Sequence, residues 1–400
     1  MQEITVTEPA FVTTFQCSGT HCRDHCCKSW NIHLDKGTVK RYLSSKDESI
    51  RKIAKGNIII LKKDVATWGM IKLDEKTRTC PYLTEERLCH VQRTLGVQAL
   101  SPTCKTFPRY ETSYKNDVRK TLHLSCPEVS KSVLTDVNAM ILKNKIIIQP
   151  TANTSPIFTQ QQKLLNLFCM GLIDQANSDT DAGLYALIKF TLFTEKFDQI
   201  DNNALGKIEL IYNTLSGQLQ SGELKDELST YSRDKTIKRA LILILQNYFC
   251  NIEPGRSSGV LNYYIQCLLR VLTLENTHTI DEGIDGLESA WQRLCKTQNE
   301  TGFDLKNLIL YKLWNSNFPN QQNDGTLRAL YMLCAEYYFI KMLIAASAYE
   351  RTYLEKEDAI NIVYSFHSLS QHNTVIPRDF HKHIETVRTG DDLSMIHLLT

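Results

Sequence analysis

Cysteine residues are concentrated near the start of this 400-residue chain, in a pattern that could bind a metal. Eight of the thirteen cysteines fall within the first 126 residues, and they are Cys17, Cys22, Cys26, Cys27, Cys80, Cys89, Cys104 and Cys126. Thiolates are soft ligands that select zinc, copper(I) or iron–sulfur clusters. Disulfides rarely persist in a reducing compartment, so such a density of thiols favours metal binding or catalysis there.

The spacing of the thiols favours an iron–sulfur cluster over zinc. Zinc sites usually present C-x2-4-C pairs. Cys22 and Cys26 fit this spacing, but the other cysteines do not repeat it as a second matched pair. Proline directly follows Cys80 and Cys126, as it follows a ligand in some iron–sulfur motifs. Zinc and unmetallated thiols remain as alternatives, and adjacent Cys26 and Cys27 are not expected to bind the same metal atom because successive side chains diverge.

The order of the motifs resembles a cysteine-cluster family described as zinc- or iron-chelating. That family carries C-x-x-C-x-x-C-C, then C-P-[FY]-L, then a cysteine, then R-P-x-x-C-R-x-F-P. Here CSGTHCRDHCC, CPYL, LCHV and SPTCKTFP follow in the same order, with wider spacing in the first block and with Ser101 and Lys105 in place of two arginines. The opening EITVTEPAFVTTFQCSGTHCRDHCCKSWNI and the total length also resemble the flagellin lysine-N-methylases of enteric bacteria, most specifically over the first 130 residues.

The resemblance implies an enzyme that methylates lysine ε-amino groups of flagellin, its protein partner, with S-adenosylmethionine as the methyl donor. It further implies an iron–sulfur cluster, expected to be 4Fe–4S, with zinc as the alternative. A subset of the eight cysteines listed above would be the metal ligands. The competing hypothesis is a non-catalytic metal-binding scaffold or a chaperone-like module for flagellin.

Methyl transfer to lysine sets chemical requirements of its own. Deprotonating the amine near pH 7 costs about 4–5 kcal/mol, so a site must desolvate the ammonium or supply a base. Aromatic faces attract a sulfonium donor or a methylated ammonium. The segment AEYYFIK contains Glu336, Tyr337 and Tyr338, which are candidates for a cofactor-binding pocket; interior tyrosines with satisfied hydroxyls are the alternative. No G-x-G occurs in the chain, which argues against a doubly wound methyltransferase fold.

Hydrophobic patterning predicts a mainly α fold, with a multi-helix C-terminal body and a small cysteine-rich α+β N-terminal domain. We place the domains at 1–150 and 151–400, with the loop TANTSP at the boundary. The segments RALILILQNYFC and NYYIQCLLRVL are apolar nearly all round, as in buried helices. Two charges interrupt the apolar stretch 329–349, which therefore predicts a buried helix rather than a membrane span. The glycines of EGIDG (282–286) are predicted to mark a linker at a helix end.

Charge and composition restrict which partners and which cellular compartment we expect for the protein. Residues 1–126 carry 21 Lys and Arg against 13 Asp and Glu, an excess that would offset thiolates. The basic run at 51–64 lacks interleaved aromatic residues, so a nucleic-acid partner is not expected. The N-terminus lacks the pattern of a signal peptide, and we expect a cytoplasmic protein with no membrane partner. The remaining cysteines are expected to be small buried hydrophobes, and they are Cys169, Cys250, Cys267, Cys295 and Cys334.

Overall fold

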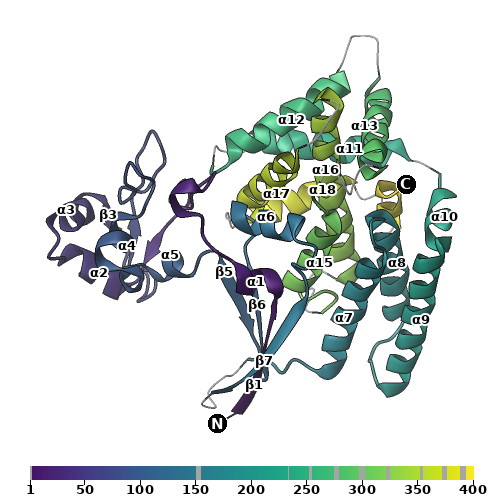
Figure 1. The fold of residues 1–400 in the computed structure, drawn as a ribbon, viewed down its shortest axis with the longest axis horizontal. Coiled ribbons are helices and arrows are strands. Elements are labelled where there is room, and N and C mark those ends of the chain that lie inside the picture. Colours follow the sequence, from purple (N-terminus) through teal and green to yellow (C-terminus); the bar gives the residue numbers. More distant parts are fainter. Residues whose placement is uncertain are drawn as a thin grey trace.

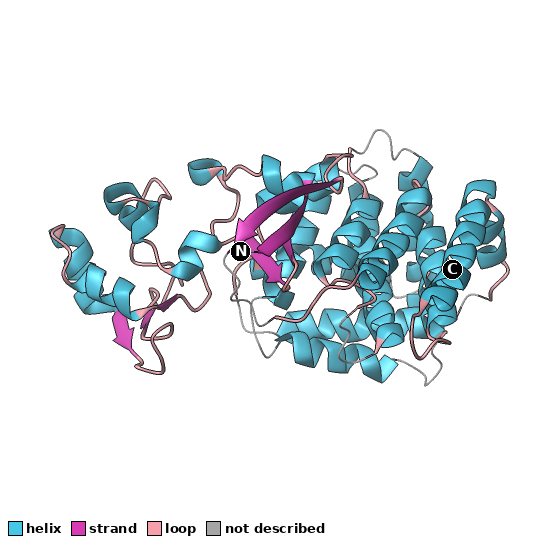
Figure 2. Ribbon diagram, turned by 90° about the horizontal axis from the view of Figure 1, so that it is seen from below, coloured by secondary structure: helices cyan, strands magenta, loops and turns pink. Residues whose placement is uncertain are grey.

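The structure is a computed structural model in which three parts can be distinguished (Figure 1). It describes residues 2–149, 155–232, 234–251, 255–273, 279–296, 302–320, 325–351, 355–371, 376–387 and 393–400. A large helical body carries a four-stranded sheet on one side, and residues 16–107, called the cysteine-rich unit, project beside the sheet (Figures 1 and 2). The predicted fold class, a multi-helix body with a small α+β N-terminal region that contains cysteines, is confirmed.

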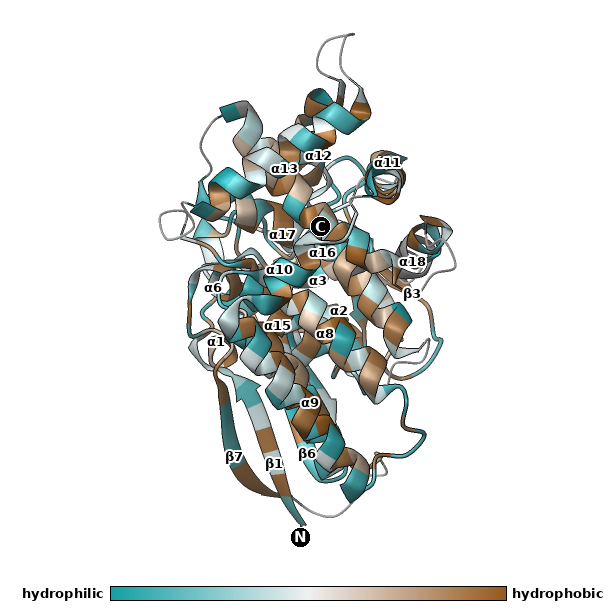
Figure 3. Ribbon diagram, turned by 90° about the vertical axis from the view of Figure 1, so that its right-hand side faces the viewer, coloured by the Kyte–Doolittle hydropathy of each residue, from teal (hydrophilic) through white to brown (hydrophobic). Residues whose placement is uncertain are grey.

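The four-stranded sheet pairs the start of the chain with strands from residues 109–149. Its strands, in the spatial order β5-β6-β1-β7, are β1 (Gln2–Pro9), β5 (Arg109–Ser113), β6 (Asp117–Leu122) and β7 (Leu142–Gln149). Strand β1 runs parallel to β6 and antiparallel to β7, which pairs with it along its whole length. Ile4 and Val6 of β1 pack with Val118 and Ile147 on one face. The outer strand β7 ends in an apolar run that is visible in Figure 3.

The cysteine-rich unit has a small core of its own. Its elements are η1 (Gly19–His21), β2 (His33–Leu34), α2 (Lys36–Leu43), α3 (Glu48–Asn57), β3 (Ile58–Ile60), β4 (Gly69–Ile71), α4 (His90–Leu95), η2 (Val97–Ala99) and α5 (Pro102–Thr106). The Asp35 and Asp47 carboxylates cap the first turns of α2 and α3. Leu34, Ile50 and Tyr82 are fully or almost fully buried in a core that also includes thiols. Packing of these short elements therefore brings the cysteine loops together.

The helical body is built around one long helix. Its helices are α7 (Gln160–Gln175), α8 (Thr180–Thr194), α9 (Asn202–Ser221), α10 (Glu223–Ser229), α11 (Lys235–Asn251), α12 (Ser258–Thr273), α13 (Ile280–Lys296), α15 (Leu305–Asn315), α16 (Thr326–Arg351), α17 (Lys356–Gln371), α18 (Ile376–Val387) and η3 (Ser394–Leu398). Two shorter helices, α1 (Ala10–Thr14) and α6 (Pro127–Thr135), connect the sheet to this body. Helix α16 packs against α8, α12, α13 and α17.

The stretch 329–349 forms most of α16, and its prediction as a buried helix is confirmed. Within the described residues, α16 is the helix that is long and apolar enough to cross a membrane by length and composition, over Thr326–Tyr349. However, 83% of that apolar window is buried inside the structure. Core helices of this kind pass the same test of length and composition, so the finding is weak evidence for a membrane span.

One prediction about the helices is wrong, and the predicted domain boundary falls on residues that the structure does not describe. The segment EGIDG lies inside α13 rather than in a linker. Its glycines serve close packing, because a Cβ at Gly283 would lie 3.0 Å from Leu272 Cα, and one at Gly286 would lie 3.1 Å from the Tyr349 ring. The predicted domain boundary, between residues 150 and 151, lies outside the described residues, and it stays a prediction.

Candidate functional site

Five of the eight N-terminal cysteines gather in and around the core of the cysteine-rich unit, and they are Cys26, Cys27, Cys80, Cys89 and Cys104. The Cys80 amide donates to the Cys27 carbonyl over 2.9 Å, which joins the first cysteine loop to the second. Cys89 forms a β-bridge with Leu83, the last residue of CPYL, across residues 84–88. Cys104 lies in the first turn of α5, where the Ser101 hydroxyl accepts from its amide over 3.2 Å. Segments up to 78 residues apart in the sequence are thereby brought into one core.

Burial and mutual proximity govern the titration of these thiols. Desolvation and, to a smaller extent, neighbouring thiols together raise the pKa of Cys80 to about 12 and that of Cys104 to about 11. Cys26 behaves in the opposite way, because a hydrogen bond from the Cys27 thiol lowers its pKa to about 7. Thiolates in this core repel one another, so a full set of them requires a cation among them.

The donor chemistry fits a soft metal centre, whereas the ligand geometry is not formed. Four or more sulfur donors from separate loops match the composition of an iron–sulfur or zinc–thiolate site. Among the described residues, no group of three or more His, Cys, Asp or Glu side chains lies where it could hold one ion. Ligation would require the thiols to turn toward a common centre, and the predicted ligand set stays a prediction.

The other three N-terminal cysteines, Cys17, Cys22 and Cys126, interact in a second group near Arg256. The Cys22 thiol donates to the Asp24 carbonyl over 3.3 Å. Arg256 lies just before α12 of the helical body, and it is only 5% exposed. Its positive charge opposes the burial that raises the pKa of Cys22 and Cys126, and it also helps to lower the pKa of Cys26. Arg256 therefore acts on both groups of thiols.

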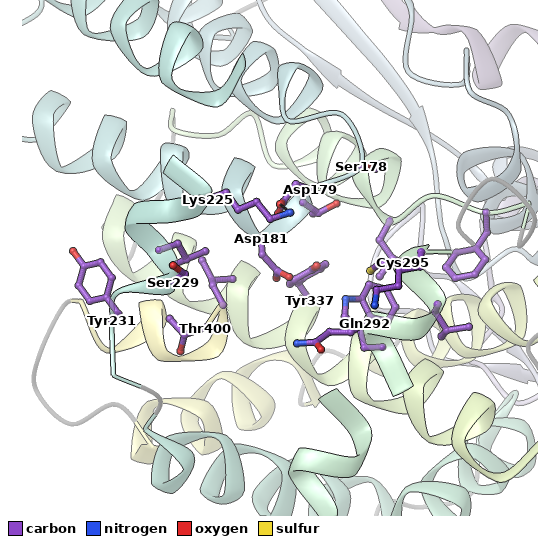
Figure 4. Close-up of a pocket in the computed structure, with 18 residues that line it drawn as sticks. Ser178, Asp179, Asp181, Lys225, Ser229, Tyr231, Gln292, Cys295, Tyr337 and Thr400 are labelled. Carbon is purple, nitrogen blue, oxygen red and sulfur yellow. Dashed lines mark ion pairs between the residues drawn. The ribbon is translucent and has the colours of Figure 1, made fainter. Parts of the chain in front are cut away.

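A cavity of about 560 Å³, called the main cavity, lies within the helical body. It is bounded by the start of α8, by α10, α13 and α16, and by the last residues of the chain. Figure 4 shows Asp181 and Tyr337 next to each other near its centre, with Lys225 reaching toward Asp179. The lining combines carboxylates, lysines, hydroxyls and aromatic rings, which suits a ligand that carries several charges.

A lysine ammonium beside the main cavity is enclosed by a carboxylate and two aromatic rings. Lys341 Nζ lies 2.7 Å from Asp181 Oδ2 and 5.6 Å from the ring centres of both Trp291 and Tyr337. Lys341 is 7% exposed, so the ion pair and the cation–π contacts stabilise a largely desolvated cation. We call Asp181, Trp291 and Tyr337 the cation cage; it comes from α8, α13 and α16.

The two aspartates at the start of α8 differ in their free hydrogen-bonding capacity. Asp179 Oδ1 accepts from the Ala182 amide over 3.0 Å, and Asp179 Oδ2 pairs with Lys225 Nζ at 2.9 Å. Asp181 uses Oδ2 for Lys341, whereas its buried Oδ1 accepts no hydrogen bond of ordinary geometry among the described residues, although the Tyr337 hydroxyl interacts with this carboxylate. Asp181 can therefore accept a proton or a hydrogen bond from a ligand.

The three candidate residues of AEYYFIK have different positions. Tyr337 lines the main cavity, and burial raises its pKa well above the ordinary value, so it remains a neutral hydroxyl. Tyr338 lines an adjoining cavity of about 100 Å³ that shares Asp181 and Trp291 with the main one. Glu336 lines neither of these two cavities and instead forms an ion pair with Lys312 of α15. Whether any of the three binds the cofactor stays a prediction.

The prediction for the five C-terminal cysteines holds for three of them. Cys169, Cys267 and Cys334 are buried, but Cys250 and Cys295 are exposed. The two exposed cysteines lie in the last turns of α11 and α13. Cys295 also lines the main cavity.

Comparison with known proteins identifies the family. A model of the FliB lysine N-methylase C-terminal domain matches residues 166–398. The chain is also 56% identical to a lysine-N-methylase of Salmonella typhimurium, over the whole of both chains. The chain belongs to the lysine N-methylase family. It is therefore an enzyme, a protein-lysine methyltransferase, as the resemblance implied. The residues matched by the family domain include almost all of the lining of the main cavity.

Two shorter relatives each match less than half of the chain. The flagellar biosynthetic protein FliU of Salmonella muenchen is 61% identical over 36% of this chain and 86% of its own length. The flagellar biosynthetic protein FliV of the same organism is 52% identical over 42% of this chain and 97% of its own length. No solved structure matches this chain.

Proposed function

We propose that this lysine N-methylase acts on flagellin in the cytoplasm, with S-adenosylmethionine as its methyl donor and with an iron–sulfur cluster in the cysteine-rich unit. Flagellin as the substrate is supported by the motif resemblance and by two relatives that are named flagellar biosynthetic proteins. The family supports lysine as the acceptor. The main cavity and its cation cage would be the place of methyl transfer.

The observation that carries this proposal is the cage around Lys341. It demonstrates that Asp181, Trp291 and Tyr337 can stabilise an ammonium away from water. A sulfonium and a lysine ammonium both require such surroundings. The main cavity, at about 560 Å³, has the size of ordinary small-molecule sites, which run from about 300 to 1,000 Å³. Lys225, which lines it, is already paired with Asp179, whereas Lys296 of the same lining can pair with the donor's carboxylate.

The cage residues would also prepare the target lysine. S-adenosylmethionine supplies a methyl group on a positively charged sulfur, and a bond from the amine nitrogen to this methyl replaces the bond from sulfur. A second positive charge nearby disfavours the protonated lysine. Asp181 Oδ1, which is buried and accepts no hydrogen bond of ordinary geometry among the described residues, would accept the ammonium proton. Tyr337, kept neutral by burial, would hold the amine by its hydroxyl.

The first test changes the proposed base. We expect Asp181→Asn to lower kcat about 100-fold or more, since a positioned base contributes roughly 10²–10⁴ to a rate. The matched control is Asp174→Asn in α7, because that carboxylate is 68% exposed and pairs with Lys306 outside the main cavity. The assay measures transfer of labelled methyl groups from S-adenosylmethionine to flagellin, with circular dichroism as the check on folding.

Two results would contradict this part of the proposal. If Asp181→Asn methylates flagellin at the wild-type rate, Asp181 is not the base. If folded wild-type protein, purified without air, transfers no label to flagellin lysines, the substrate or the donor is wrong. Label on a different protein in a cell extract would separate these two cases.

The second test concerns the cluster, for which we propose Cys80, Cys89, Cys104 and one of Cys26 and Cys27 as ligands. These thiols share one core and repel each other as thiolates, which a cationic centre would relieve. A cluster in which every iron is bound by a cysteine would have a structural or an electronic role. Protein purified without air should be brown, with broad visible absorption and bound iron. Serine at Cys80, Cys89 or Cys104 should remove most of the iron, whereas serine at the exposed Cys250 should not.

Zinc is the second candidate, because the thiol donors would suit it equally. A colourless preparation that contains zinc and no iron would replace the cluster with a zinc site. If serine at any of the three ligand positions leaves the metal content unchanged, the proposed ligand set is wrong. If metal is lost but flagellin is still methylated, the centre has no part in catalysis.

A further inference from the structure

A second cavity, of about 180 Å³, lies between the four-stranded sheet and the end of α15. We call it the sheet cavity. Its lining residues are Tyr110, Thr112, Tyr114, Arg119, Thr121, Trp314, Asn315, Ser316 and Asn317. Arg119 is the charged residue in this list, and it is only 5% exposed. A cavity with one buried cation and several hydroxyl and amide groups is suited to a small polar ligand rather than to an apolar one.

The hydrogen bonds that hold Arg119 leave donor capacity unused. Its Nη1 donates to the Asn317 side-chain oxygen, and its Nη2 donates to the Asn166 side-chain oxygen over 2.6 Å. The guanidinium also lies 3.6 Å from the ring centre of Trp314. Two of the five N–H groups of an arginine are used in these bonds. Both acceptors are neutral amides, so neither compensates the positive charge.

The charges around Arg119 do not balance. Asp117, two residues earlier on β6, is the carboxylate that interacts with it electrostatically. Asp117 is already paired, because its Oδ2 lies 2.7 Å from Lys163 Nζ. Arg119, Lys163 and Asp117 therefore form a group with one excess positive charge, and Arg119 and Asp117 are buried. A buried charge without a counter-ion is costly, and burial lowers the pKa of Arg119 to about 10.

We propose that the sheet cavity binds a small carboxylic acid whose carboxylate pairs with Arg119. A planar guanidinium presents parallel N–H groups that match a carboxylate. The ligand should also carry a hydroxyl or amino group, because the buried side-chain oxygen of Asn315 has no hydrogen-bond partner among the described residues. The volume admits only a molecule of a few heavy atoms. This site is separate from the main cavity and does not rest on the proposed methyl transfer.

A purely structural role for Arg119 predicts a different behaviour. In that case Arg119 only ties β6 to α7 and to the end of α15, and water fills the sheet cavity. Replacing Arg119 would then destabilise the protein without affecting any ligand. Asn315 separates the two roles, because it lines the cavity but takes no part in the bonds between Arg119, Asn166 and Asn317. Leucine has nearly the same shape as asparagine, so Asn315→Leu should remove the hydrogen-bonding amide from the cavity wall and leave those bonds in place.

The experiment titrates the full-length protein with glycolate, acetate and inorganic phosphate at constant ionic strength, by calorimetry and by thermal unfolding. We expect saturable binding of glycolate, weaker binding of acetate, which lacks the hydroxyl, and a Tm that rises with glycolate concentration. Arg119→Lys should weaken glycolate binding at least about tenfold, because lysine loses the bidentate geometry. Asn315→Leu should lower the affinity for glycolate to that for acetate, because the partner of the ligand hydroxyl is lost, and should keep the Tm of the ligand-free protein near the wild-type value.

The proposal is overturned if neither carboxylic acid binds saturably up to roughly 10 mM, an affinity of about −3 kcal/mol. It is equally overturned if Asn315→Leu binds glycolate as well as the wild type does. Binding of phosphate more tightly than glycolate would reject a carboxylate as the ligand. Since Asn315→Leu does not disturb the bonds of Arg119, misfolding of an Arg119 variant does not decide the outcome.

Discussion

At the scale of single residues, Arg256 links the cysteine-rich unit to the helical body. Its Nε donates to Asp24 Oδ2 over 3.2 Å, and its Nη2 donates to the carbonyls of Asp24 and Ser125 over 3.0 Å each. Asp24 lies between Cys22 and Cys26. The body therefore holds the middle of the first cysteine motif, and the position of these thiols depends on a residue more than 200 positions away in the sequence.

Replacing this arginine should destabilise the protein strongly. Arg256→Ala removes the only charged donor that the largely buried Asp24 carboxylate has among the described residues, and leaves it the neutral Ser257 hydroxyl. It also takes one donor from each of two carbonyls, so we expect the free energy of unfolding to fall by about 3 kcal/mol. Arg23→Ala is the matched control, because Arg23 also connects this motif to the body, through Glu357 and Asn361, but as a more exposed pair. That change should cost less than about 1 kcal/mol. Equal losses in urea unfolding would contradict the special role of Arg256.

The sequence indicated some of the site residues but not their partners. The cysteines and Tyr337 could be recognised because their chemistry is visible locally, as thiol motifs and as a carboxylate–aromatic segment. Asp181 and Trp291 carry no such local signal, although an aspartate pair at a helix start could have attracted notice. They join Lys341 only because α8, α13 and α16 pack together. Such contacts between distant segments depend on tertiary structure that a single sequence does not display.

At the scale of elements, the helices were easier to predict than the sheet. Apolar segments such as 329–349 identify buried helices by composition alone. Strand β6 has the sequence DVRKTL, which is too polar to be recognised as a central strand. It is a strand because β1 and β5 pair with it on either side, and its polar side chains find partners in the body. The glycines of α13 were assigned to a linker for the same reason, since the close packing that requires them involves neighbouring helices that the local sequence does not show.

Those glycines yield a prediction about helix packing. In Gly283→Ala the new Cβ would lie 3.0 Å from Leu272 Cα and 3.1 Å from the Val271 carbonyl oxygen. Backbone atoms cannot move away cheaply, so we expect the free energy of unfolding to fall by about 1–3 kcal/mol. Gly259→Ala in α12 is the control, because its Cβ would meet nothing within 4 Å. It should be neutral or stabilise by up to about 1 kcal/mol.

Urea unfolding of the two glycine variants gives the comparison directly. Opposite signs, or a clear loss at Gly283 alone, would confirm close contact between α12 and α13. A gain in stability at both positions would show that α13 has room next to α12, contrary to the structure.

At the scale of the whole molecule, the helical body and the cysteine-rich unit differ in what holds them together. One extensive apolar core runs through the helical body and the adjoining face of the sheet, and the cysteine-rich unit has a much smaller core that includes Cys80. The basic excess of residues 1–126 fits a unit whose thiols become negative when they bind a metal. A small core that contains ligand side chains depends on its metal for stability.

Metal removal should therefore loosen one part of the molecule and leave the other intact. We expect hydrogen exchange of amides in residues 28–104 to become at least about tenfold faster after iron is removed by a chelator under reducing conditions, because local opening no longer breaks metal–sulfur bonds. Peptides from α16, which is buried at the centre of the body, should exchange at unchanged rates. Mass spectrometry resolves both regions in one experiment, so α16 is the internal control. If both regions loosen together, the metal stabilises the whole fold; if neither does, the thiol core is stable on packing alone and the proposed centre has no structural role.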